Sequence, residues 1–348
     1  MPHPPLGKTA EYDDYGSRER VELRSGAGVM AALHPRRILV FRPGAIGDTL
    51  LSFPALLALR RRFPGAEVWG VGNAAALRLA AAHGIIDRAE AFGAAWVSDL
   101  FGDQPVRSAW LATFDLGIVW MHTREAAADL AARLAAAGVG TVLPLVSFPA
   151  PGSRCHLADH LLATLEPLGI AGPRPDVSLA LPGDGERLVI LHPGAGGRHK
   201  RWPAAHFACL ADRFANLGLP IAVTRGPADA AAVTAFLDQV RRARPIVLEE
   251  LDLVDLAAIL GRARLFIGND SGITHLAALA GAPTVAIFGP YDPIYWAPLG
   301  RYVAVIDAGL RCPHRTDPRD GCRTCDMLAG LGVEVVWQAA VEMRKMIS

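Results

Sequence analysis

Short apolar runs alternate with amphipathic segments along most of the chain after residue 36. In the first half, apolar runs predict buried strands at 38–41, 67–71 and 116–120, and helical spacing predicts helices over 48–62 and about 125–137. The second half repeats this pattern, with strands predicted at 188–191, 221–224, 246–248, 265–267 and 284–288, and helices at 203–217, 228–242, 253–260 and 272–280. Strands that alternate with helices form parallel sheets covered on both faces. We therefore predict an α/β protein made of two such halves with a cleft between them.

Proline and glycine positions divide this pattern into domains. The stretch 171–186 holds three prolines and three glycines and predicts a linker. Pro54 falls inside the helix predicted over 48–62, where it should kink the helix or mark a short first turn. The expected organisation is a loose tail at 1–35, a first domain at 36–175, a second domain at 176–332, and a C-terminal helix at 333–348 that packs back on the first domain.

Composition and charge narrow the class of protein. Hydrophobic residues make up 51% of the 348 and charged residues 20%, which excludes general disorder. The formal net charge of +1 gives no global basic field, so we expect no nucleic-acid partner. Two windows without charged residues, 134–153 and 271–291, are broken by prolines and glycines, so we predict no membrane span. Peripheral contact with a membrane surface is left open.

Cysteine usage and the amino-terminal residues indicate the compartment. The first twenty residues have no apolar core of the kind that a signal peptide carries. Five cysteines are an odd number, so a disulfide framework is not expected. We therefore predict a protein of the reducing cytoplasm.

The first candidate site is the glycine loop at 42–48, RPGAIGD, which lies between a predicted strand and a predicted helix. Gly44 and Gly47 allow a tight turn and the close approach of a ligand. The spacing is not G-x-G-x-x-G, so the loop lacks the dinucleotide-binding fingerprint. Asp48 fits either a helix N-terminal partner, which the residues alone favour, or a general base that faces the cleft.

The second candidate site is the loop at 192–203, HPGAGGRHKRWP, which again joins a strand to a helix. Its three glycines expose backbone N–H groups, and three cations, Arg198, Lys200 and Arg201, add positive charge. The loop lacks the Gly-Lys-Ser/Thr ending of a P-loop, which excludes that class of ATPase. We favour phosphate binding over the alternative of an exposed basic turn before the helix.

The third candidate site is the segment 269–275, NDSGITH, at the junction of a strand and a helix. Ser271 is a good N-cap, and the helix N-terminus behind it can hold an anion. Thr274 and His275 fall on the first turn, near such an anion. The alternative, in which Asp270 and Ser271 only cap the helix and His275 is a core residue, is equally compatible with the spacing.

A fourth group combines Cys312 and His314 with Cys322 and Cys325. Three thiols and one imidazole could form a tetrahedral zinc site. Only the second pair has the Cys-x-x-Cys ligand spacing, whereas the first is Cys-x-His. We therefore predict that the chain holds no metal, and the structural metal is the less favoured alternative.

Taken together, the segments 42–64, 192–203 and 269–293 resemble glycosyltransferase family 9, the bacterial ADP-heptose:lipopolysaccharide heptosyltransferases. Their order and separation fit that family, and the likeness extends thinly over residues 37–340. The resemblance implies a GT-B architecture, in which two Rossmann-like domains face each other. The first domain would bind the acceptor and the second the nucleotide-sugar.

The resemblance also implies roles for individual residues. Asp48 would be the catalytic base, and Lys200 would contact the donor phosphate or sugar with Trp202 beside it. The donor side would comprise His192, Gly194, Lys200, Trp202, Asp270, Ser271, Gly272, Thr274 and His275, and the acceptor side Arg42, Gly44 and Gly47. No metal or cofactor beyond the nucleotide-sugar would be needed.

The resulting hypothesis is an inverting glycosyltransferase that moves heptose from ADP-heptose to a lipid-linked saccharide, the lipopolysaccharide core. One alternative is a family 9 enzyme with another nucleotide-sugar or a protein acceptor. A second alternative is a noncatalytic nucleotide-binding protein of the same fold. The sequence specifies neither the acceptor nor an oligomeric state.

Overall fold

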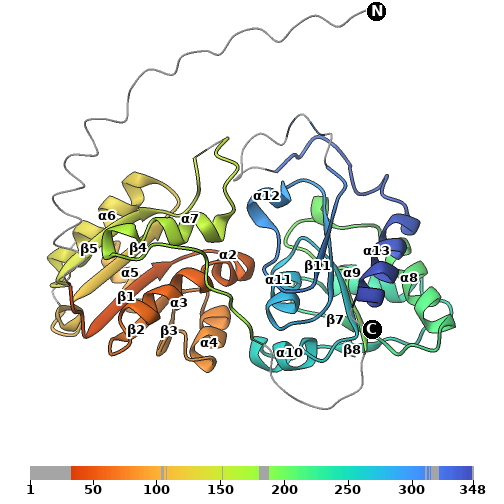
Figure 1. Ribbon diagram of the computed structural model, residues 1–348, viewed down its shortest axis with the longest axis horizontal. Coiled ribbons are helices and arrows are strands. Elements are labelled where there is room, and N and C mark those ends of the chain that lie inside the picture. Colours follow the sequence, from red (N-terminus) through yellow and green to blue (C-terminus); the bar gives the residue numbers. More distant parts are fainter. Residues whose placement is uncertain are drawn as a thin grey trace, which may run out of the picture.

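The computed structural model describes residues 33–346, apart from 103–105, 107, 151, 180–187, 310–311, 313 and 315–320. Two parallel sheets with helices on both faces form two lobes that lie side by side (Figure 1). The tail predicted at 1–35 lies outside the described residues except at its last three positions, and the linker predicted at 171–186 is described only up to residue 179. The α/β class predicted from the alternating pattern is confirmed.

The first sheet has five parallel strands in the order β3-β2-β1-β4-β5. Its strands are β1 (Arg37–Arg42), β2 (Glu67–Gly72), β3 (Arg88–Ala91), β4 (Leu116–Met121) and β5 (Thr141–Val146). Its helices are α2 (Ile46–Leu50), α3 (Phe53–Arg62), α4 (Ala74–Ala82), α5 (Ala95–Leu100), α6 (Arg124–Ala136) and α7 (Leu157–Ala163). The edge strands β3 and β5 were not predicted, because β3 reads RAEA and β5 is interrupted by Pro144.

The second sheet has six parallel strands in the order β11-β10-β9-β6-β7-β8. Its strands are β6 (Val189–His192), β7 (Ile221–Thr224), β8 (Ile246–Leu248), β9 (Leu265–Asn269), β10 (Thr284–Phe288) and β11 (Val303–Asp307). Its helices are α8 (Ala204–Asn216), α9 (Ala230–Leu237), α10 (Leu253–Leu260), α11 (Gly272–Leu279), α12 (Pro293–Trp296) and α13 (Val333–Met346). Counted within the half, this order is 6-5-4-1-2-3, the doubly wound arrangement of dinucleotide-binding sheets.

Two predicted helices have different bounds in the structure. The helix predicted over 48–62 is divided into α2 and α3, with Pro54 in the first turn of α3, where its missing N–H costs no hydrogen bond. The helix predicted over 228–242 ends at Leu237. The Asp212 carboxylate accepts hydrogen bonds from the backbone N–H groups of residues 241–243, at 2.7–3.3 Å, and fixes that segment as a turn instead.

One hydrophobic cluster joins the two halves. Ile38 and Val40 of the first sheet and Ile190 and Phe266 of the second belong to the same buried group. Helix α2 packs against α11, and α4 packs against α10. The two helices of each pair lie next to each other in Figure 1. This interface holds the carboxyl ends of the central strands of both sheets near one another.

The C-terminal helix corrects the prediction that it packs back on the first domain. Helix α13 contacts α8, β9, β10 and β11, all elements of the second sheet (Figure 1). Its buried side chains, Val336, Ala340 and Met343, recur at helical spacing and enter the core of the second sheet. The sequence showed an amphipathic helix but carried no information about which apolar face would cover it.

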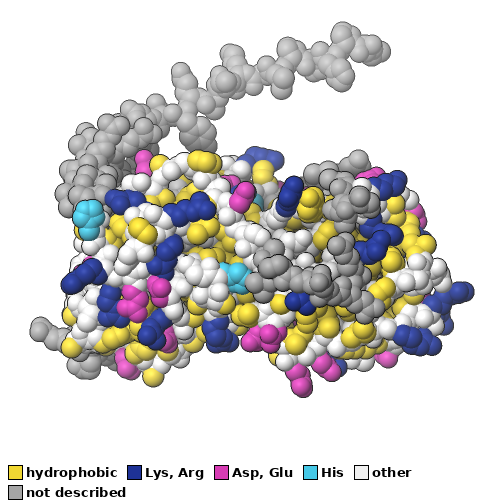
Figure 2. Space-filling model, turned by 60° about the horizontal axis from the view of Figure 1, so that its bottom comes forward, with side chains coloured by type: hydrophobic (Ala, Val, Ile, Leu, Met, Phe, Trp, Pro, Cys, Tyr) yellow, Lys and Arg dark blue, Asp and Glu magenta, His cyan; other side chains and the backbone are white. Residues whose placement is uncertain are grey.

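The face of the molecule that Figure 2 draws carries mixed charge. Figure 2 shows Lys and Arg side chains interspersed with Asp and Glu side chains over both lobes. The absence of a nucleic-acid partner stays a prediction. Within the described part of the chain, each helix is too short or too polar to cross a bilayer.

Candidate active site

The site residues gather where the strand order of each sheet reverses. In the first sheet the reversal lies between β1 and β4, and in the second it lies between β6 and β9. Open α/β sheets bind ligands in the crevice beyond the carboxyl ends of such strands. The loops after these four strands carry Asp48, His122, Lys200 and Asp270, and all four side chains line one cavity.

Asp48 is held in place by its own loop. Its Oδ2 accepts a hydrogen bond from the backbone N–H of Ala45 at 2.8 Å, which is the role of a helix N-terminal partner. Its Oδ1 lies 3.8 Å from Nη2 of Arg42. The carboxylate also lines the cavity between the sheets. Both interpretations of Asp48 from the sequence are therefore compatible, because one oxygen orients the side chain and the other can accept a proton.

Arg42 lies beneath Asp48 rather than on an acceptor-facing surface. Its side chain is 3% exposed, and its Nη1 donates to the carbonyl of Pro43 at 2.6 Å. Burial lowers the pKa of Arg42, and the nearby Asp48 carboxylate opposes that shift. The structure thus makes Arg42 a buried partner of Asp48, which corrects its assignment to the acceptor side.

The two glycines of this loop have different roles. Gly44 has a φ of +152°, and a Cβ there would lie 2.8 Å from the Asp48 Cβ. Gly47 faces the other half of the protein, where a Cβ would lie 3.1 Å from the His275 ring. Gly44 therefore shapes the loop around Asp48, whereas Gly47 lets α2 approach α11.

The substitution Gly44→Ala tests this role. The added methyl group would be strained at that φ and would collide with Asp48, so we expect the base to be displaced. A displacement of about 1 Å can cost about 100-fold in rate, and the strain costs about 1–3 kcal/mol of unfolding free energy. Turnover and urea unfolding would be measured against Gly65→Ala, where a Cβ meets open space. Parent-like behaviour of both variants would contradict the assignment.

The loop after β6 is built by buried polar groups. The imidazole of His192 hydrogen-bonds through Nδ1 to Thr224 Oγ1 at 2.7 Å, and burial lowers its pKa to about 4. A Cβ on Gly194 would lie 2.0 Å from Asp229 Oδ1, so only glycine fits. His192 borders the larger of two adjoining cavities, whereas Gly194 supports the loop from behind.

Asn269 fastens this loop to the second sheet, and its role was not predicted. Its Nδ2 donates to the carbonyls of Pro193 and Gly194 at 3.0 and 3.3 Å. Its Oδ1 accepts from the backbone N–H of Trp202 at 2.9 Å. The side chain is fully buried, so these three hydrogen bonds satisfy polar groups that water cannot reach. The signal in the sequence was an amide residue at the end of an apolar strand.

Trp202 is a core residue, which corrects the expectation that it lies beside the donor. Its ring is 1% exposed, stacks edge-on against Phe207, and donates from Nε1 to the carbonyl of Leu331 at 2.8 Å. It anchors the end of the loop in the core of the second sheet. Trp202 comes two positions after Lys200, and the short helical turn Arg198–Lys200 ends between them, so the two side chains need not share a surface.

Lys200, Asp270 and Tyr291 form the charged wall of the cavity. The Lys200 ammonium lies 2.8 Å from Asp270 Oδ2 and 4.0 Å from the centre of the Tyr291 ring. Asp270 is nearly buried, while Lys200 is partly exposed. Carboxylate and ring together hold the ammonium at the cavity wall. The role of Tyr291 was not predicted, although the residue lies within the segment 269–293 that carries the family resemblance.

The amino end of α11 completes this wall. Ser271 caps the helix by accepting from the Thr274 N–H at 3.3 Å. Thr274 is buried and donates from its hydroxyl to the Asn269 carbonyl at 2.5 Å, so it holds the turn and does not face the cavity. A Cβ on Gly272 would lie 2.7 Å from Ile46 Cβ, so this glycine permits the contact between α2 and α11.

His275 combines features of the two alternatives from the sequence, a cavity residue and a core residue. It is 4% exposed, as in a core histidine, yet it lines the cavity beside Asp270. Burial lowers its pKa to about 4, and the Asp270 and Asp48 carboxylates oppose the shift.

This lowered pKa predicts a pH dependence of stability. The unfolded chain takes up a proton on His275 as the pH falls through about 6.5, whereas the folded chain stays neutral until about pH 4. The stability that the neutral ring contributes is therefore complete above pH 6.5 and declines toward pH 4, by about 1.4 kcal/mol for each pH unit between these two values. Urea unfolding between pH 7.5 and 4.5 should show a shallower decline for His275→Gln than for the parent or for the exposed-site variant His34→Gln. Equal slopes in all three would contradict this account.

Two adjoining cavities fill the cleft. The smaller has a volume of about 290 Å³ and is lined by Asp48, Lys200, Asp270, His275, Tyr291, His122, Phe148 and Trp296. The larger has a volume of about 440 Å³ and is walled mainly by apolar side chains, Ile46, Leu248, Leu251, Leu253, Leu256 and Ile273. The two share Ala45, Gly196, Ser271 and Gly272 as a common border. The arrangement offers an apolar chamber, a border rich in backbone N–H groups, and a chamber with a base and a cation.

Known proteins resemble this chain over part or most of its length. The family model of glycosyltransferase family 9 (heptosyltransferase) matches residues 169–322. Lipopolysaccharide heptosyltransferase 3 of Escherichia coli is 28% identical over 171 residues, which are 44% of this chain and 50% of that protein. The chain thus spans about half the length of this curated relative.

Solved structures share the fold over most of the chain. E. coli ADP-heptose lipopolysaccharide heptosyltransferase II matches with a TM-score of 0.70 and 20% identity, over 89% of this chain and 99% of that one. The glycosyltransferase family 9 protein of Veillonella parvula matches with a TM-score of 0.68 and 21% identity, over 89% and 97%. At such identities the likeness establishes the fold, and the predicted GT-B architecture is confirmed. Over residues 169–322 the chain matches the model of glycosyltransferase family 9, the family that its glycine-loop motifs resemble.

Proposed function

We propose that this protein is an inverting glycosyltransferase that transfers heptose from ADP-heptose to a lipopolysaccharide core acceptor. The observation that carries the proposal is that Asp48 and Lys200 line one cavity from opposite sheets. A base and a cation on opposite sides of a cleft are the two groups that transfer from a nucleotide-sugar needs. The heptosyltransferase relatives supply the choice of donor and acceptor.

In the proposed complex the donor spans the two cavities. The nucleoside occupies the larger one, where Leu248, Leu251 and Leu253 offer apolar walls to the base. The diphosphate crosses the border at Gly196 and Ser271, next to the amino end of α11. The sugar then occupies the smaller cavity, with its reacting carbon between Lys200 and Asp48.

The chemical step is an in-line displacement. The acceptor hydroxyl oxygen forms a bond to the anomeric carbon as Asp48 Oδ1 accepts the hydroxyl proton. The bond from that carbon to the diphosphate oxygen breaks, and ADP leaves with the electron pair. Lys200 and the amino end of α11 stabilise the negative charge that develops on the leaving group. Attack from the opposite side inverts the configuration of the sugar.

The acceptor enters over the first sheet. His122, Phe148 and Trp296 form an aromatic rim on the smaller cavity, with His122 and Phe148 edge-on at 4.9 Å and Phe148 and Trp296 at 5.9 Å. Aromatic faces of this kind suit the apolar face of a sugar ring. Since the proposed acceptor is lipid-linked, the proposal puts the enzyme in the cytoplasm in peripheral contact with the inner membrane face.

Calorimetric titration with ADP-heptose, ADP, UDP and a UDP-sugar tests the proposed donor. We expect saturable binding of both adenine compounds and weaker binding of the uridine compounds. Incubation with ADP-heptose and a heptose-deficient core lipid should then release ADP in proportion to product. Preference for a uridine nucleotide would overturn the donor assignment. Adenine-selective binding without ADP release would instead favour a noncatalytic nucleotide-binding protein.

A further inference from the structure

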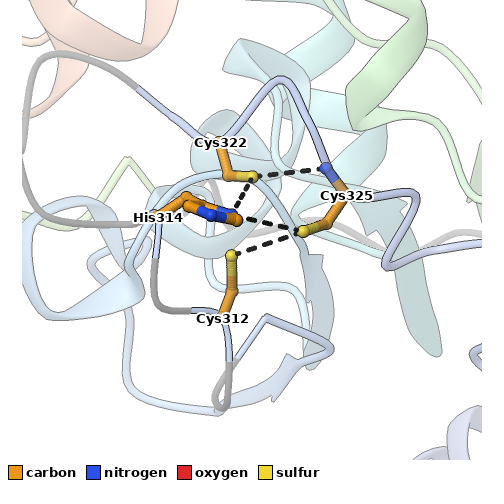
Figure 3. A group of neighbouring side chains, drawn as sticks. All are labelled: Cys312, His314, Cys322 and Cys325. Atoms are coloured by element: carbon orange, nitrogen blue, oxygen red, sulfur yellow. Dashed lines mark hydrogen bonds between the residues drawn. The ribbon is translucent and has the colours of Figure 1, made fainter.

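Four metal-ligating side chains converge outside the two cavities, in the segment after β11. Figure 3 shows Cys312, His314, Cys322 and Cys325 pointing toward a common centre. Their four ligand atoms all lie within 4.8 Å of one another. Cys312 and Cys325 Sγ are 3.9 Å apart, and His314 Nδ1 is 3.5 Å from Cys325 Sγ and 4.0 Å from Cys322 Sγ. The fold thus gathers at one point the ligands that the sequence places in two separate pairs.

These separations match the edges of a metal-centred tetrahedron. Zn–S bonds of about 2.3 Å and Zn–N bonds of about 2.0–2.1 Å give S···S edges of about 3.8 Å and S···N edges of about 3.6 Å. The sulfur pair and the two sulfur–nitrogen pairs lie close to these values. A disulfide would require an S–S distance of about 2.05 Å instead. Four ligand atoms around one point therefore fit a single bound ion better than a disulfide between two of the cysteines.

The second thiol pair has a further feature of a metal ligand turn. The backbone N–H of Cys325 points at Cys322 Sγ, with a separation of 3.4 Å. Hydrogen bonds to a coordinating sulfur stabilise its thiolate charge and fix its orientation. Cys322 is buried and so sits at the inner side of the cluster. The Cys-x-x-Cys spacing thus folds into the local geometry that metal binding requires.

We propose that Cys312, His314, Cys322 and Cys325 bind one thiophilic divalent metal ion, with Zn²⁺ as the metal that the donor set favours. Three sulfurs and one imidazole nitrogen form a closed tetrahedral set of the kind found in structural zinc sites. Because all four positions are taken by protein ligands, the ion has no open position for a substrate. The site is structural, which agrees with a transfer reaction that needs no metal.

The metal would hold the segment that backs the charged wall of the cavity. The Cys322 N–H donates to the Pro290 carbonyl at 2.9 Å. A Cβ on Gly321 would lie 2.7 Å from the Tyr291 ring, so this segment packs directly on Tyr291. Tyr291 in turn lies against the Lys200 ammonium. Loss of the ion should therefore make the position of the Lys200 side chain less well fixed. The effect of this change on donor binding rests on the proposed function, whereas the metal site itself does not.

Elemental analysis of the purified full-length protein tests the site directly. We expect one zinc or iron ion per chain in the parent and in Cys209→Ser, whose thiol lies on α8 away from the cluster. Cys322→Ser and Cys325→Ser should bind the metal at least about 100-fold more weakly, more than the loss of an outer hydrogen-bond partner usually costs. Cobalt substitution of the parent should give the ligand-field and thiolate charge-transfer bands of a tetrahedral thiolate site. This measurement needs no variant, so it tests the site even if the cysteine variants fail to fold.

Two results would overturn the proposal. One is a parent protein without stoichiometric metal after expression and refolding in zinc or iron. The other is a Cys312–Cys325 disulfide found by mass spectrometry of the protein prepared under reducing conditions. Removal of the metal by a chelator should also lower the melting temperature and weaken ADP binding. Loss of metal with unchanged ADP binding would leave the site standing and reject only its link to Lys200.

Discussion

Asp48→Asn is expected to lower turnover by about 10²–10⁴-fold while the affinity for ADP-heptose stays within a few-fold of the parent. Asparagine keeps the side-chain oxygen that accepts from the Ala45 N–H, so the loop geometry is retained. It cannot accept the proton of the acceptor hydroxyl, because its amide is not basic. Single-turnover ADP release and calorimetric titration measure the two quantities separately.

The control for this variant is Asp129→Asn, which removes an exposed carboxylate from α6 on the same half of the protein. It should leave both turnover and affinity unchanged. Undiminished turnover of Asp48→Asn would reject Asp48 as the base. An equal loss of donor affinity in Asp48→Asn would indicate instead that the carboxylate acts in binding.

The second large effect is expected for Lys200→Ala, with turnover lowered by about 10²–10³-fold and weaker donor binding. The ammonium lines the smaller cavity, into which the diphosphate would lead, and it balances the nearly buried Asp270 carboxylate. Without Lys200, this carboxylate would face the diphosphate as an uncompensated like charge. The double variant Lys200→Ala/Asp270→Asn should therefore bind ADP more tightly than Lys200→Ala alone.

Lys345→Ala is the matched control, because this lysine lies exposed near the end of α13, on the second half of the protein. Donor affinity and turnover should stay at the parent values there. Two outcomes would contradict the role of Lys200. One is parent-like ADP affinity in Lys200→Ala, and the other is a double variant no tighter than the single one.

The fold was largely predictable from periodicity. Strands buried on both faces, such as β1 and β9, are continuous apolar runs, and amphipathic helices such as α6 and α8 follow from spacing alone. The edge strands β3 and β5 escaped prediction because they are half exposed and need no apolar run, as Arg88 and Pro144 illustrate, whereas the edge strand β8 was predicted and β11 was missed. Helix ends were predicted wrongly where a group distant in sequence fixes the backbone, as the Asp212 carboxylate does after α9.

The site was predictable in its chemistry but not in its assignments. Glycine loops after strands identified the segments of Asp48, Lys200 and Asp270, because ligands approach parallel sheets at those places. The segments could not reveal that Arg42 is buried or that Trp202 belongs to the core. Burial depends on which elements pack together, and neighbours in sequence do not share it.

The sequence by itself thus determined two halves with parallel sheets covered on both faces, and the loops that carry Asp48, Lys200 and the helix end at Ser271. Local spacing encodes these features, since strands, helices and tight turns depend on residues close along the chain. Only the tertiary structure decided that α13 covers the second sheet, that Asp48 and Lys200 share one cavity, and that Cys312 and His314 meet Cys322 and Cys325. The first two depend on contacts between segments far apart in sequence, which the packing of apolar faces selects and no local pattern records. The four ligand side chains are close along the chain, and only the three-dimensional structure shows that they converge.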